Sequence, residues 1–127
     1  MGQLLIKNAK LVNENIQREC DILLENNFIQ RIDSSISPKN AKVIDVKGKY
    51  VLPGMIDDQV HFREPGLTQK GTIATESRAA LAGGITTYME QPNTVPQTTT
   101  IEKLEEKFNI AANTSFANYS FLFGGTN

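Results

Sequence analysis

The first 52 residues carry short apolar runs separated by turn-forming residues, a pattern typical of β-strands. Four such runs are found, over residues 4–12, 21–32, 43–46 and 50–52. The pair Asn26-Asn27 interrupts the second run, which predicts a hairpin there. We therefore expect residues 1–52 to form a small antiparallel sheet without a large core of its own.

After Pro53 the pattern changes to alternating strands and helices. Strands are predicted over residues 54–61, 85–89 and 116–123, with helices over 73–82 and from 101 to 111. The first helix is expected to end at Gly83-Gly84, and the second to begin with a capping box made by Thr99 and Glu102. Strand–helix–strand order is the signature of parallel βαβ units, so residues 53–127 are predicted to be α/β.

Each predicted helix has one apolar stripe at helical spacing. The buried positions are expected to be Ile73, Ser77, Ala80 and Leu81 in the first helix and Ile101, Leu104, Phe108 and Ala111 in the second. These stripes would cover one face of the strands.

Composition excludes several classes of function. The chain has 127 residues, 13 Lys and Arg against 14 Asp and Glu, and 39% apolar residues. Such a balance offers no basic surface for nucleic acid, and no apolar run is long enough to cross a membrane. Cys20 is the single cysteine and has no internal disulfide partner. A cytoplasmic protein is expected.

The densest chemical signal is the run from Asp57 to Gly66, DDQVHFREPG. In a regular strand Asp57, Gln59 and His61 share one face, where two side chains can approach one metal ion. His61 also falls at the strand end, where parallel α/β folds keep their active sites. An ordinary structural histidine is the alternative.

Two further polar residues follow strand ends. Arg63 can grip a carboxylate with two parallel hydrogen bonds, or it can form a surface salt bridge with Glu64. The amide of Asn93, in the run QPNT, can donate to a carboxylate, or it can simply favour a turn beside Pro92.

Together, the runs LPGMIDDQVHFREPG and AALAGGITTYMEQPNTVP strongly resemble the dihydroorotase branch of the cyclic amidohydrolases. The resemblance implies a small β-sandwich followed by a TIM-type (β/α)₈ metal-dependent hydrolase barrel. It implies reversible, zinc-dependent cyclisation of N-carbamoyl-L-aspartate to dihydroorotate in pyrimidine biosynthesis. By the same resemblance His61 is a metal ligand, and Arg63 and Asn93 bind the substrate. Asp57 would orient a metal ligand through a hydrogen bond, a common role of acids beside metal-binding histidines, or it would simply cap the start of the strand.

Gln59 departs from the family pattern, which has a histidine at this position. An amide oxygen is a poorer zinc ligand than imidazole, so Gln59 is a doubtful ligand for one of the one or two expected zinc ions. We expect an active variant subfamily, because Arg63 and Asn93 keep the right residue types. A related hydantoinase- or allantoinase-like enzyme is one alternative. A non-catalytic scaffold that supports a partner such as aspartate transcarbamoylase is another.

The length sets a limit on the barrel, which takes about 250 residues. His61 is the only histidine, and the family's catalytic aspartate is expected beyond residue 127. We therefore expect the chain to be an N-terminal piece of a longer enzyme, inactive and prone to self-association when isolated. The parent is expected to act on a small molecule, and it can form a homo-oligomer.

Overall fold

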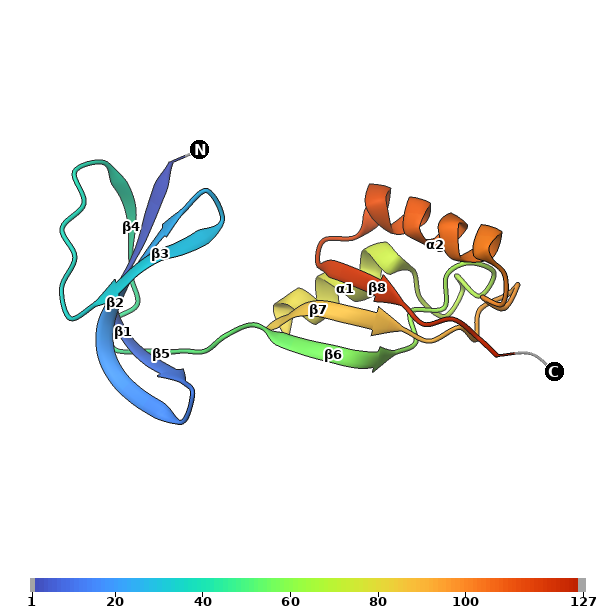
Figure 1. Ribbon diagram of the computed structural model, residues 1–127, viewed down its shortest axis with the longest axis horizontal. Coiled ribbons are helices and arrows are strands. Elements are labelled where there is room, and N and C mark those ends of the chain that lie inside the picture. Colours follow the sequence, from blue (N-terminus) through green and yellow to red (C-terminus); the bar gives the residue numbers. More distant parts are fainter. Residues whose placement is uncertain (1, 126–127) are drawn as a thin grey trace. The chain divides into compact units, whose positions relative to one another are not determined.

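The computed structural model describes residues 2–125, which fall into two compact units that divide between Pro53 and Gly54 (Figure 1). The first unit contains the strands β1 (Gln3–Asn13), β2 (Ile16–Glu25), β3 (Phe28–Asp33), β4 (Ala41–Asp45) and β5 (Tyr50–Val51). The second contains β6 (Met55–Val60), α1 (Ile73–Ala82), β7 (Ile85–Glu90), α2 (Ile101–Thr114) and β8 (Asn118–Phe121).

The five strands of the first unit form one mixed sheet in the order β3-β2-β1-β4, with β5 also pairing with β1. The predicted hairpin is confirmed, and both Asn26 and Asn27 adopt the positive φ of a tight turn. The prediction of a purely antiparallel sheet is wrong, because β4 and β5 pair with β1 in parallel. Long connections allow this pairing, and local patterns do not encode it. Residues 2–53 form this one sheet, so the sandwich stays a prediction.

A buried carboxylate connects three segments of the first unit by hydrogen bonds. Asp21, on β2, is 3% exposed. Its two oxygens accept the backbone N–H groups of Asn8 at 2.9 Å and Ile36 at 3.0 Å. Asn8 lies at an irregularity in the β1–β2 register, so Asp21 satisfies an amide that the ladder leaves unpaired.

The second unit is a parallel sheet in the order β6-β7-β8, with both helices on one face (Figure 1). This is the predicted α/β arrangement. The core between sheet and helices is aromatic at its centre, where the Phe62 and Tyr88 rings lie 4.4 Å apart. Burial raises the pKa of Tyr88 to about 12.

The first predicted helix is confirmed at both ends. α1 begins after Thr72, which forms a capping box with Thr75, and it ends at Gly83. The cap predicted for α2 is wrong by one residue, because Thr100 rather than Thr99 accepts the backbone N–H of Lys103. Within residues 2–125, neither helix is long and apolar enough to cross a membrane.

The apolar stripes are only partly buried. Ile73, Ser77, Ala80 and Ala111 are buried as predicted, and Leu104 is partly buried. The prediction is wrong for three residues, because Leu81 is 40%, Phe108 39% and Ile101 66% exposed. In α2 Lys107 is fully buried, on the same stripe as Leu104 and Ala111. The burial of this lysine ties the helix to the candidate site.

Candidate functional site

The ends of β6 and β7 bring the predicted site residues together. The strands are parallel neighbours, and the Gln91 backbone N–H donates to the Val60 carbonyl at 3.0 Å. The loops that follow, residues 61–67 and 91–98, therefore leave the sheet at the same edge. In α/β folds this edge is where ligands bind.

His61 and Asn93 are in direct contact across these two loops. Asn93 Oδ1 lies 3.0 Å from His61 Nδ1. An amide oxygen only accepts hydrogen bonds, so Nδ1 is the donor here, and the neutral ring in this tautomer has its lone pair on Nε2. Both residues are exposed, and the two Nδ2 hydrogens of Asn93 are available to a ligand.

Arg63 is held by its backbone rather than by its side chain. It has a left-handed φ of 73°, and its N–H donates to Glu90 Oε1 at 2.9 Å. No salt bridge with Glu64 is formed; Glu64 Oε2 accepts the Ile73 N–H at the start of α1, at 2.8 Å. Among residues 2–125 the Arg63 guanidinium makes no ion pair, so its charge is open to a ligand.

The two loops are packed tightly against each other. The Val95 N–H donates to the Pro65 carbonyl at 3.1 Å. A Cβ on Gly66 would lie 1.8 Å from the Val95 carbonyl oxygen, so only glycine permits this approach. Beside Asn93 is a small hollow of about 200 Å³, lined by Pro92, Asn93, Gln97, Thr99, Gly124 and Gly125.

Under these loops lies a buried ion pair that the sequence analysis did not identify. Glu90 Oε2 is 2.9 Å from Lys107 Nζ, and each side chain is 1% exposed. Burial raises the pKa of Glu90, and the Lys107 ammonium acts against this rise. The spacing contained a signal, because Lys107 lies three residues after Leu104 and four before Ala111, on the buried stripe itself.

Asp57 and Gln59 are placed differently from the prediction. Between Asp57 and Val60, β6 has one residue more than β7, so the alternation assumed for residues 57–61 is broken. The cause is local: Asp57 Oδ1 accepts the Gln59 backbone N–H at 3.1 Å. Gln59 is exposed, and the Asp57 carboxylate bonds to backbone rather than to the His61 ring.

The described residues do not make a zinc site by themselves. A catalytic zinc ion takes three protein ligands, mostly imidazole, thiolate or carboxylate. Residues 2–125 contain no group of three such side chains placed to share an ion. At this edge His61 offers an imidazole, whereas the carboxylates of Glu64 and Glu90 each accept a backbone N–H.

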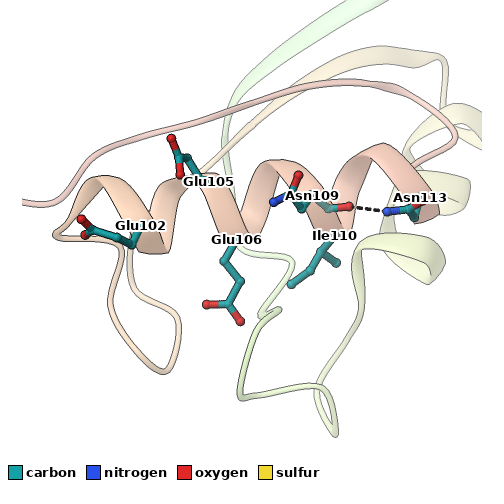
Figure 2. A pocket seen from close by; sticks show the side chains of 6 residues that line it. All are labelled: Glu102, Glu105, Glu106, Asn109, Ile110 and Asn113. Carbon is teal, nitrogen blue, oxygen red and sulfur yellow. Dashed lines mark hydrogen bonds between the residues drawn. The ribbon is translucent and has the colours of Figure 1, made fainter.

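A larger hollow of about 500 Å³ lies along α2 and contains none of the predicted site residues (Figure 2). Three glutamates contribute to its lining, but Figure 2 shows Glu105 and Glu106 pointing to opposite sides of the helix. Asn113 is already used, because its Nδ2 donates to the Asn109 carbonyl at 2.7 Å. The carboxylates do not converge on a common point.

Comparison with known proteins matches residues 48–122 to the family described as dihydro-orotase-like. The chain is 38% identical over 127 residues to a dihydroorotase of Methanosphaera stadtmanae, covering 98% of this chain and 29% of that protein. It is 46% identical over 98 residues to a dihydroorotase of Aquifex aeolicus, covering 76% of this chain and 23% of that protein. The chain thus spans less than a third of the length of these relatives.

Among solved structures, an L-hydantoinase (dihydropyrimidinase) from Arthrobacter aurescens is similar, with a TM-score of 0.93 and 34% identity. The match covers 99% of this chain and 28% of that one. A D-hydantoinase from a Thermus species matches with a TM-score of 0.79 and 35% identity, over 94% of this chain and 27% of that one. From the family match across the segment that carries both loops, the chain belongs to the dihydroorotase-like family.

Proposed function

We propose that this chain is part of a dihydroorotase, which interconverts N-carbamoyl-L-aspartate and dihydroorotate. The observation that carries the proposal is the junction of the two loops, where His61 Nδ1 lies 3.0 Å from Asn93 Oδ1. Arg63 follows two residues after His61, with a guanidinium that no carboxylate among residues 2–125 neutralises. The dihydroorotases among its relatives support the same assignment.

The chain's own residues would bind and orient the substrate. Dihydroorotate carries a free carboxylate, which the Arg63 guanidinium can hold with two parallel hydrogen bonds. Asn93 can donate from Nδ2 to the same group, while its Oδ1 stays bonded to His61. Holding the carboxylate at two points fixes the ring and lowers the entropic cost of reaction.

The zinc ions expected for the whole enzyme remain a proposal. His61 would offer Nε2, because Asn93 occupies Nδ1. Gln59 would add at most an amide oxygen, so other ligands are needed for a stable site. Asp57 bonds to backbone in this structure and would act only at a distance from the metal.

We also propose that β6, α1, β7, α2 and β8 are the first units of a (β/α)₈ barrel, with residues 1–52 belonging to a small β-sandwich. Parallel strands with helices on one face are the building pattern of that fold. Because one histidine cannot hold a catalytic metal, residues 1–127 alone would be inactive. Cytoplasmic location, homo-oligomer formation and a transcarbamoylase partner stay predictions.

The likeness to hydantoinase structures supports a second candidate, a cyclic amidohydrolase for hydantoin-like rings. The two candidates differ in the substrate carboxylate, which dihydroorotate has and unsubstituted hydantoin and dihydrouracil lack. The protein that carries this chain should be assayed for ring opening of all three compounds. A clear preference for dihydroorotate is expected, and faster opening of hydantoin or dihydrouracil would overturn the proposal.

A further inference from the structure

The Glu90–Lys107 ion pair lies directly beneath the two loops of the candidate site. Glu90 is the last residue of β7, and Lys107 is in the middle of α2. Lys107 Nζ also lies 4.9 Å from the centre of the Phe121 ring, so both charges are enclosed by the core of the second unit.

Each partner of the pair contacts one of the two loops. Glu90 Oε1 accepts the Arg63 N–H at 2.9 Å, which holds the first loop where its backbone is left-handed. Lys107 Nζ donates to the Gln91 carbonyl at 3.2 Å, two residues before Asn93. One ion pair therefore connects the backbone near both predicted substrate-binding side chains.

Stability alone does not account for such a pair. Removing two charges from water is costly, and apolar residues of similar volume often stabilise a core equally well. Buried polar groups instead fix one arrangement among several, provided that their hydrogen-bonding capacity is used. Here Glu90 Oε1 and Lys107 Nζ hydrogen-bond to backbone groups of the site loops, and Glu90 Oε2 has the ion pair with Lys107 but no hydrogen bond.

We propose that Glu90 and Lys107 are positioning residues, which set the separation between Arg63 and Asn93 and so the fit to the substrate carboxylate. This inference rests on the proposed function. Glu90 would act by holding the Arg63 backbone, and Lys107 by holding Gln91 and by balancing the charge of Glu90.

The test uses two double variants in the protein that carries this chain. Glu90→Gln with Lys107→Met keeps an acceptor for the Arg63 N–H, whereas Glu90→Leu with Lys107→Met removes it. Neither variant leaves a buried charge unpaired, so both are expected to fold. Tyr88→Phe serves as a control, because it removes only the hydroxyl that bonds to Ser115 Oγ in the same core and keeps the ring that packs on Phe62.

Two readouts are compared, amide hydrogen exchange at Arg63 and the steady-state kinetics of dihydroorotate opening. The leucine variant is expected to exchange the Arg63 amide at least about tenfold faster than the glutamine variant. It is also expected to raise KM for dihydroorotate about tenfold with little change in kcat, because ground state and transition state lose the same contact. Tyr88→Phe should change neither.

A purely structural role would move melting temperature and leave KM and Arg63 exchange equal in the two double variants, and that result would overturn the inference. Failure of the proposed function gives a different result, since the unaltered protein would then not open dihydroorotate. In that case the exchange measurement still decides whether Glu90 holds Arg63. Equal exchange in the two variants would refute the positioning role.

Discussion

Gly66 sets how closely the two site loops approach, and its replacement by alanine tests this packing. An added Cβ would lie 1.8 Å from the Val95 carbonyl oxygen, where ordinary contacts begin at 3.4 Å. The loops must then separate by more than an ångström. Separation breaks the 3.1 Å hydrogen bond from Val95 to Pro65, which is worth about 1 kcal/mol.

Alanine at Gly66 also has to adopt the left-handed φ of 84°, at a cost of about 1–2 kcal/mol. The total expected loss of unfolding free energy is about 2–3 kcal/mol. Gly84→Ala is a matched control, because Gly84 has a φ of 90° but no atom within 4 Å of the added Cβ. It should cost only the conformational part.

Urea unfolding followed by far-ultraviolet circular dichroism compares the two variants in the same protein. Gly66→Ala is expected to cost at least about 1 kcal/mol more than Gly84→Ala. Equal losses would show that the loops are not in contact at Gly66 and would refute the packing described here.

Four other results are expected. Arg63→Met should raise KM for dihydroorotate about 10- to 100-fold, because charged hydrogen bonds to the substrate are lost. The KM of Arg63→Lys should lie between those of Arg63→Met and the unaltered protein. An unchanged KM in Arg63→Met would exclude Arg63 from the carboxylate site. Gln59→His should raise zinc content, measured by plasma mass spectrometry, and activity appearing from zero would identify the natural chain as a scaffold. A spectrophotometric titration should find one tyrosine with a pKa of about 12, and this ionisation should be absent in Tyr88→Phe. The free energy of unfolding should fall between pH about 10 and 12, because Tyr88 ionises at lower pH in the unfolded state than in the folded state. Residues 1–127 alone should form oligomers on size exclusion and open no dihydroorotate, and a monomer with cooperative unfolding would count against this expectation.

Much of the second unit could be predicted because its elements are encoded locally. Helical spacing and the Gly83-Gly84 stop gave α1 at the residues where the structure has it. The parallel order brought His61, Arg63 and Asn93 to one edge, as expected for strand ends. These predictions needed only periodicity and turn chemistry.

The missed features depend on contacts between distant segments. The sequence analysis did not single out Lys107, because lysine rarely lies in a core, and only its partner Glu90, on another element, makes burial tolerable. The His61–Asn93 hydrogen bond likewise needs two loops in register. At the bulge after Asp57, the Asp57 side chain accepts the Gln59 backbone N–H, and the expected alternation is broken there.

The buried ion pair also constrains how this family can diverge. Losing either charge alone leaves the other buried without a partner, which is strongly destabilising. A relative with a neutral residue at position 90 is therefore expected to carry a neutral residue at position 107 as well. Substitutions at these two positions should covary across dihydroorotase-like sequences, although one lies at the end of a strand and the other in the middle of a helix.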